Sequence, residues 1–188
     1  MNERSRYETI AVIIVVLILL SNVLIAQSNH FEGYDGLAWG SSVQDLKKKY
    51  PEVVETTDKE DRKYNQRYFV ITSGNYDRVF FYFDDKLYTG RTVYENVDET
   101  FTFALMEKVV EEYGKFTDYG ESEKSDSDYY WFEISITKNF SVMIEAYEYV
   151  DNLGRITSNM VFITYSDDVV WNKVREYEIE QKKKNIEL

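Results

Sequence analysis

The segment 78–94 has the most regular pattern of side chains in the chain. In its first half the apolar residues divide by parity, as in a pleated strand: Val79, Phe81 and Phe83 fall on one side, and Phe80 and Tyr82 on the other. Asp84-Asp85-Lys86 interrupts the run with turn-forming residues, and the pattern resumes from Leu87 to Tyr94. We therefore predict a β-hairpin here, which the other segments cover or extend.

Four further segments have the composition and the period of strands. They are Arg67–Ser73, Tyr129–Lys138, Ser141–Val150 and Thr157–Ser166. Short turn-forming segments at residues 138–139 and 151–154 separate the last three. Residues 115–128 are polar and acidic, and we predict a loop there.

Two segments have the period of amphipathic helices. The first starts with a predicted capping box, Ser41 with Gln44, and ends at Pro51. The second spans residues 100–113, and Gly114 follows it where a helix often ends on a glycine. Its apolar residues recur at helical spacing and predict one buried stripe: Phe103, Met106, Val109, Val110 and Tyr113.

A third helix is predicted near the C-terminal end. Asp167 or Asp168 caps its start, and Val170, Val174 and Tyr177 form one stripe.

The order of elements is helix, three strands, helix, three strands, helix. Hairpin-linked strands between helices predict an α+β fold, with an antiparallel sheet built from two helix–three-strand units. The unit helices cover one face, and a C-terminal helix is added. We place a single domain at residues 27–181, with units at about 31–97 and 98–166, a helix at 167–181 and a frayed tail at 182–188.

The first 26 residues are predicted to be a targeting segment. Arg4 and Arg6 precede an uninterrupted apolar run over residues 10–20, and Ala26 offers a small residue for cleavage. This order is typical of a secretory signal peptide.

The alternative is an uncleaved membrane anchor over residues 10–26, at the short end of the roughly 17–25 residues that span a bilayer. Both alternatives export residues 27–188 to the periplasm or the cell surface. Membrane contact is expected only through the uncleaved segment.

The composition excludes several classes of function. The formal net charge of −12 argues against a nucleic-acid partner, whose phosphates it repels. The chain has no Cys, which excludes disulfides, zinc–thiolate sites, thiol catalysis and a lipidated anchor. The single histidine, His30, lies close to the predicted cleavage site, and we do not expect it to be catalytic. No cofactor is expected.

Aromatic residues are abundant, at 16% of the chain, and extend to the second side of the strands. By parity this side is expected to carry Tyr82 or Phe80, Tyr94, Trp131, Tyr147 and Tyr149. Other parts of the chain could cover this face, or it could be a Tyr-rich face in solvent. The functional alternative is a platform of amphipathic rings that binds a partner.

Carboxylates supply two further candidate sites. Glu133, Glu145 and Glu148 lie on neighbouring predicted strands, and Trp131 could stack on a sugar. The acidic residues of segment 118–128 could hold calcium, although the ligand order of an EF-hand is absent. In both cases a solvated acidic surface is the alternative.

Three motifs give the chain a resemblance to known proteins: Gly36-Leu-Ala-Trp-Gly-Ser-Ser-Val-Gln-Asp-Leu46, Phe81-Tyr-Phe-Asp-Asp-Lys-Leu-Tyr88 and Glu112-Tyr-Gly-Lys115. They resemble those of uncharacterised exported bacterial proteins with a Trp-Gly-x-Ser helix start. The order of elements over about residues 31–165 resembles modules of outer-membrane-assembly accessory lipoproteins and of β-lactamase inhibitor proteins. The chain lacks the lipidated Cys of those lipoproteins. The resemblance implies a non-enzymatic, protein-binding role in the envelope.

Two hypotheses follow. The first is a non-catalytic exported envelope protein that binds another protein through the sheet-face aromatics or the acidic loop. The second is a small carbohydrate-binding protein or glycan hydrolase that uses Trp131 with Glu133 and Glu145. A broad flat patch favours the first, and a concave pocket with convergent acids favours the second.

Overall fold

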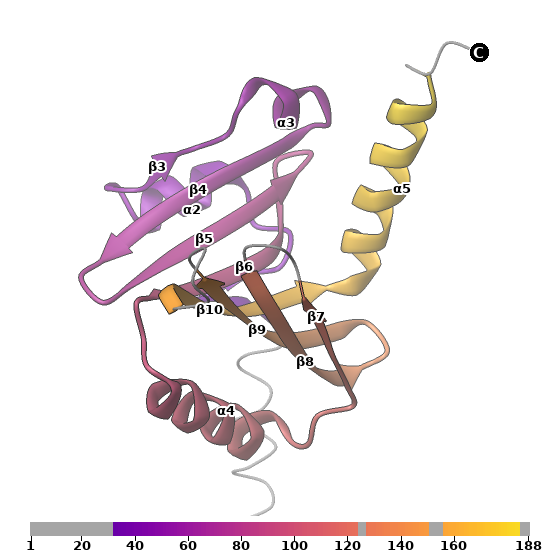
Figure 1. Cartoon of the computed structure of the whole chain (residues 1–188). Coiled ribbons are helices and arrows are strands. Elements are labelled where there is room, and N and C mark those ends of the chain that lie inside the picture. Colours follow the sequence, from indigo (N-terminus) through magenta and orange to yellow (C-terminus); the bar gives the residue numbers. More distant parts are fainter. Residues whose placement is uncertain (1–31, 124–126, 151–155, 185–188) are drawn as a thin grey trace, which may run out of the picture.

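The structure is a computed structural model that describes residues 32–123, 127–150 and 156–184 (Figure 1). These residues form an eight-stranded antiparallel sheet, a two-stranded sheet and four helices, so the predicted α+β class is confirmed. The predicted targeting segment, residues 1–26, and His30 lie outside the described residues. No helix of the described part is both long enough and apolar enough to cross a membrane.

The first unit contributes two short helices and four strands of the large sheet. Its elements in chain order are β1 (Gly33–Tyr34), β2 (Leu37–Ala38), α2 (Val43–Lys49), β3 (Val54–Glu55), α3 (Lys59–Lys63), β4 (Gln66–Ser73), β5 (Tyr76–Phe83) and β6 (Lys86–Glu95). Strands β5 and β6 are the predicted hairpin. Asp84 and Asp85, at its turn, both have positive φ, 48° and 60°, as a two-residue hairpin turn requires.

The capping box of α2 lies one residue later than predicted. The Ser42 hydroxyl accepts from the backbone N–H of Asp45 at 3.2 Å, and the Asp45 carboxylate accepts from the Ser42 N–H at 2.9 Å. The predicted pair, Ser41 with Gln44, is therefore wrong. Adjacent serines offer two equivalent caps, and the carboxylate of Asp45 is the stronger acceptor for the second bond.

The second unit has one long helix and four strands. Its elements are α4 (Glu99–Tyr113), β7 (Asp118–Glu123), β8 (Ser127–Thr137), β9 (Phe140–Val150) and β10 (Ile156–Asp167). Gly114 is the C-cap of α4 with φ of 103°, at the predicted position. Helix α5 (Asp168–Lys184) follows β10 directly. Asp167 caps it, because its carboxylate accepts from the backbone N–H groups of Val169 and Val170 at 3.1 and 3.2 Å.

Two predicted boundaries need correction. Residues 118–123, which we expected in a loop, form β7, the edge strand beside β8. Helix α5 continues to Lys184, so residues 182–184 belong to its last turn and not to a frayed tail. Each unit thus has four strands in the sheet, where three were expected.

The strand order of the large sheet is β3-β4-β5-β6-β10-β9-β8-β7. The last strand of each unit lies at the centre, and β6 pairs there with β10 in the register Val93↔Phe162. We call this central pairing the seam. The two units are therefore arranged as mirror-ordered halves of one sheet.

The unit helices α2 and α4 pack on one face of the sheet, which we call the helical face. In the first unit, Val43 and Leu46 of α2 form a core with Phe69 and Phe80. In the second unit, a separate core joins α4 to the central strands: Val109, Tyr113, Ile134, Val142, Ile144, Val161 and Ile163.

Helix α5 packs on the opposite face, which we call the α5 face. The ring of Tyr177 lies 5.5 Å from that of Phe83, and Gln66 donates to the Glu178 carboxylate. These contacts carry α5 over the first unit, and Figure 1 shows it rising away from β8 and β9.

Candidate functional site

Three of the predicted binding residues, Trp131, Tyr147 and Tyr149, lie together on the α5 face of the second unit. The β8–β9 register pairs Tyr129 with Tyr147, and residues two apart in a strand share a face. The ring centroid of Tyr147 lies 4.6 Å from that of Tyr129 and 5.4 Å from that of Phe162. The ring of Tyr149 stacks 6.5 Å away. We call these half-buried residues the aromatic patch: Tyr129, Trp131, Tyr147, Tyr149 and Phe162.

The other two predicted binding residues, Tyr82 and Tyr94, lie on the helical face, so their placement with Trp131 is wrong. Tyr82 is fully buried beneath α2, with its ring 5.5 Å from that of Phe69. Its alternative, Phe80, is fully buried in the same core. Alternation along one strand shows which of its residues share a face. It does not show which residues of a distant strand lie on that same face of the sheet.

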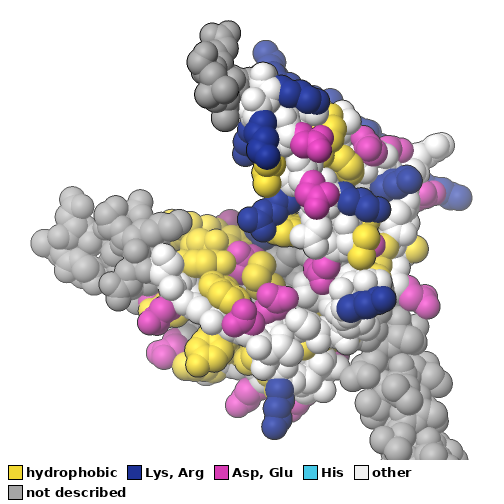
Figure 2. All heavy atoms as spheres, turned by 90° about the vertical axis from the view of Figure 1, so that its right-hand side faces the viewer, with side chains coloured by type: hydrophobic (Ala, Val, Ile, Leu, Met, Phe, Trp, Pro, Cys, Tyr) yellow, Lys and Arg dark blue, Asp and Glu magenta, His cyan; other side chains and the backbone are white. Residues whose placement is uncertain are grey.

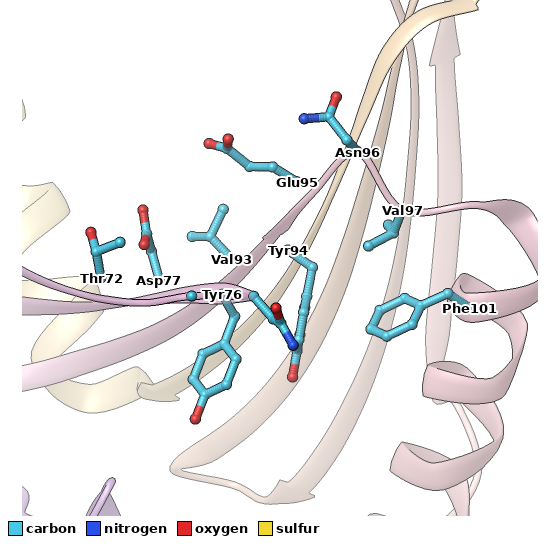
Figure 3. Close-up of a pocket in the computed structure, with 11 residues that line it drawn as sticks. Thr72, Tyr76, Asp77, Val93, Tyr94, Glu95, Asn96, Val97 and Phe101 are labelled. Atoms are coloured by element: carbon cyan, nitrogen blue, oxygen red, sulfur yellow. The ribbon is translucent and has the colours of Figure 1, made fainter.

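Tyr94 contributes to a hollow of about 710 Å³ at the end of β6. Its ring lies 5.1 Å from that of Phe101 on α4 and 5.7 Å from that of Tyr76. Figure 3 shows Tyr76 and Tyr94 on one side of the strand, and Asp77, Val93 and Glu95 on the other. The hollow therefore does not bring its carboxylates against its rings, and we do not take it as the principal site.

An ion pair lies at the centre of the α5 face. Arg91 of β6 donates to the Glu145 carboxylate at 3.0 Å and to the Thr164 hydroxyl at 2.9 Å. The Arg91 guanidinium also lies 5.6 Å from the ring centroid of Phe81 and 5.1 Å from that of Phe162. The residue Glu145 is only 6% exposed. Because the pair crosses the seam and borders the aromatic patch, it fixes the patch to the first unit.

A cleft of about 490 Å³ lies between α5 and the α5 face, and we call it the α5 cleft. The sheet contributes Arg91, Glu133, Glu145 and Thr164, and the helix contributes Asp168 and Trp171. Figure 2 faces this side of the molecule and shows hydrophobic side chains with carboxylates among them below the C-terminal helix. The cleft therefore adjoins the aromatic patch and shares the Arg91–Glu145 pair with it.

Two carboxylates in the α5 cleft are held in an environment that disfavours their charge. Burial, and next the nearby Asp168, raise the pKa of Glu133. Burial also raises the pKa of Asp168, against the opposing effect of the Ser141 hydroxyl, which donates to it at 2.8 Å. In the described part of the chain, neither carboxylate has a cation within ion-pair distance.

The residues of the predicted sugar site are only partly brought together. Glu133 and Glu145 line the same cleft, whereas Glu148 lies on the helical face and lines a different hollow with Phe103. Trp131 packs against Gly120 of β7, where a Cβ atom would lie 2.7 Å from the indole ring. Its indole therefore packs on the edge strand β7 and does not line the cleft.

The predicted acidic loop is in part an extended strand. Asp118 and Tyr119 of β7 pair with Glu133 and Phe132 of β8, and successive side chains of a strand point to opposite faces. Carboxylates spaced along such a strand do not converge on one ion. Among the described residues no group of three or more His, Cys, Asp or Glu side chains is placed to hold a metal.

The sequence interpretation missed four residues of this site: Tyr129, Phe162, Arg91 and Asp168. Tyr129 has the same parity as Trp131 and could have been found by extending the pattern by one step. Arg91 is the only charged residue between Leu87 and Tyr94, which is a detectable signal for a buried partner. Nothing local places Phe162 or Asp168 beside the others, because the pairing of β10 with β9 and the Ser141–Asp168 hydrogen bond bring them there.

Comparison of the chain with protein-family models, with curated proteins and with solved structures finds no significant match.

Proposed function

We propose that this protein is a non-catalytic, exported module of the bacterial envelope that binds another protein through the aromatic patch. The observation that carries the proposal is the position of Trp131, Tyr147 and Tyr149 on the side of the second unit from which α5 turns away. Tyr and Trp are enriched at protein interfaces, because their rings bury a large area and keep a polar end for hydrogen bonds.

The patch is held in place before any partner arrives. Tyr147 is in ring contact with Tyr129, Tyr149 and Phe162, and Tyr129 donates to the Glu145 carboxylate at 3.2 Å. Rings fixed in this way lose little conformational freedom on binding, which lowers the entropic cost of association. This supports binding by contact with a preformed surface.

The charge of the chain supports a partner of opposite sign. A net charge of −12 attracts a basic surface and speeds its encounter at low ionic strength. Export is proposed on the basis of residues 1–26, whether they are cleaved as a signal or kept as an anchor.

The experiment is site-specific photocrosslinking in cells that export the protein. A crosslinker at Tyr149 is compared with one at Ala104, an exposed position of α4 on the helical face. The proposal expects one dominant protein crosslinked from position 149 and absent from position 104. That protein is then purified, and its affinity for wild type and for Tyr147→Ser is measured. Identical crosslinks from both positions, or no binding by the purified partner, would contradict the proposal.

A second candidate function is supported by one observation: Glu133 and Glu145 line one cleft. A carboxyl group with a raised pKa beside an ionised carboxylate is the arrangement of a glycan hydrolase. It is tested by the release of reducing ends from cell-wall glycans. Glu133→Gln should abolish hydrolysis under this alternative.

A further inference from the structure

The α5 cleft has more negative charge than its own residues neutralise. Three carboxylates and one guanidinium line it, namely Glu133, Glu145, Asp168 and Arg91. The guanidinium is already engaged, since it donates to Glu145 and to Thr164 and lies close to two aromatic rings. Glu133 and Asp168 are therefore left without a cation in the described part of the chain.

A cation on the helix side of the cleft is also engaged. The Arg175 guanidinium on α5 lies 5.7 Å from the ring centroid of Trp171, which itself lines the cleft. Trp171 is 43% exposed, so this cation and ring sit at the entrance. A cation held over an indole is attracted to the ring face and is not directed at a carboxylate.

The walls of the cleft suit the stem of a long cationic side chain. Met143 lies on the sheet side, and Tyr88 and Phe81 lie on the first-unit side. Lys and Arg bury their methylene stems along apolar surface while the charged end finds a carboxylate. A cleft with aromatic and aliphatic walls and two unneutralised carboxylates therefore matches these two side chains.

We infer that the partner places a Lys or Arg side chain in the α5 cleft, with its charge between Glu133 and Asp168, while the rest of the contact covers the aromatic patch. This inference rests on the proposed function, because it names the chemistry of the partner at the edge of the same surface. The two carboxylates repel each other in the free protein. A cation placed between them relieves this repulsion, and the relief adds to the free energy of binding.

The experiment uses a matched pair of probes with the intact exported protein recovered from cells. The probes are N-acetyl-L-arginine methylamide and N-acetyl-L-citrulline methylamide, which have nearly the same shape and differ in charge. Binding is followed by the backbone amide resonances of Glu133, Ser141 and Asp168. The expected result is a saturable shift with the arginine probe and an affinity at least about tenfold lower for the citrulline probe, which corresponds to the loss of one ionic contact.

The variant Glu133→Gln/Asp168→Asn should lose the arginine response by at least about tenfold as well. The control is Glu176→Gln, an exposed carboxylate on α5 outside the cleft, which should keep the full response. The double variant removes two like charges from a partly buried site, so we expect it to melt no lower than wild type. Its loss of binding then cannot come from unfolding.

Three outcomes overturn the inference: equal responses to both probes, an unchanged response in the double variant, or no saturable shift at any concentration that leaves the protein folded. These outcomes are separate from failure of the proposed function. If a partner still crosslinks at position 149 in the double variant with unchanged affinity, the aromatic patch binds a protein and the cleft does not hold its cation.

Discussion

The two units share a plan but differ in how they are covered. In the first unit, helix α2 packs on the helical face and α5 on the opposite face, so the central strands lie between helices. In the second unit, α4 covers the helical face, and the α5 face carries the aromatic patch. On the α5 face, Gln66 and Tyr88 of the first unit are buried, whereas Tyr147 of the second unit is half-buried.

This difference shows that the number of aromatic residues does not determine which surface can bind. Both units are rich in rings, and the path of α5 decides which rings of the α5 face a helix covers. Because α5 leaves β10 toward β4 and β5, it covers part of the α5 face of the first unit and leaves the aromatic patch of the second unit uncovered by a helix. The following substitutions test this difference between the units, in decreasing order of their expected effects.

The largest effect is expected from Arg91→Ala, because Arg91 joins the units across the seam. Glu145 would stay buried without its cation, and breaking a buried pair in this way costs about 3–5 kcal/mol. Urea unfolding measures the loss. Arg175→Ala, which removes an exposed guanidinium on α5, serves as the control and should change stability by less than about 0.5 kcal/mol. A loss near zero for Arg91→Ala would mean that water reaches Glu145.

The next effect compares the buried and the exposed apolar residues of the unit helices. Leu46 of α2 is fully buried, so Leu46→Ala should cost about 2–5 kcal/mol through lost burial and the cavity left behind. Phe103 of α4 is 57% exposed, and Phe103→Ala should change stability by less than about 0.5 kcal/mol. Thermal unfolding of both variants tests this, and equal losses would show that Phe103 is part of a core.

A smaller change is expected in the aromatic patch itself. Tyr147→Ser and Trp131→Ser each remove a half-buried ring, and each should cost about 1–2 kcal/mol while the protein remains folded. Partner crosslinking at position 149 should be lost. Tyr119 of β7 is 74% exposed, and Tyr119→Ser should keep both stability and crosslinking. Global unfolding of either patch variant, seen by near-UV circular dichroism, would show that these rings are core.

For two tyrosines of the first unit, loss of the hydroxyl group should change stability in opposite directions. The hydroxyl of Tyr82 is buried without a hydrogen-bond partner, so Tyr82→Phe should be neutral or stabilise the protein by up to about 1 kcal/mol. The hydroxyl of Tyr34 is hydrogen-bonded to that of Thr92 at 2.9 Å, and Tyr34→Phe should cost about 0.5–1.5 kcal/mol. Chemical denaturation of the pair gives the comparison, and a cost for Tyr82→Phe would indicate a bound water.

The smallest effect concerns the pH dependence set by Glu133, whose pKa is raised by burial and by Asp168. Between the ordinary carboxyl pKa, about 4.3, and the raised value, the folded state binds more protons than the unfolded state. Stability from this group therefore falls as pH rises through that range. Glu133→Gln lacks this loss and should melt above wild type at pH 7, with a difference that vanishes at acid pH. A constant difference across pH would contradict the raised pKa.

The sequence predicted the elements whose signals are local. The β5–β6 hairpin follows from the turn at Asp84 and Asp85, and the end of α4 follows from Gly114. Strand β7 was missed because its residues are polar and acidic. It is a strand because β8 pairs with it and Trp131 covers Gly120, which are contacts between segments.

The candidate site was predictable only in its second-unit half. Trp131, Tyr147 and Tyr149 share a parity on adjacent strands, so local alternation was enough to group them. Tyr82 and Tyr94 were grouped with them wrongly, because the side that a strand presents depends on the register of the seam. The β5–β6 register also shifts between Phe81 and Tyr82, and such a shift cannot be seen in a regular alternation.

The seam also affects the order in which the strands of the sheet can pair during folding. Arg91 and Thr164, which meet there, are separated by 73 residues, and contacts so distant in sequence are slow to form because a long loop must close first. Phe162 belongs to β10, which is the last strand in chain order. A chain that emerges from a translocation channel N-terminus first can therefore build the β4–β6 meander early. If the chain is exported as proposed, the aromatic patch is complete only when nearly all of the chain has been delivered, and a partner that binds this patch would bind late in export.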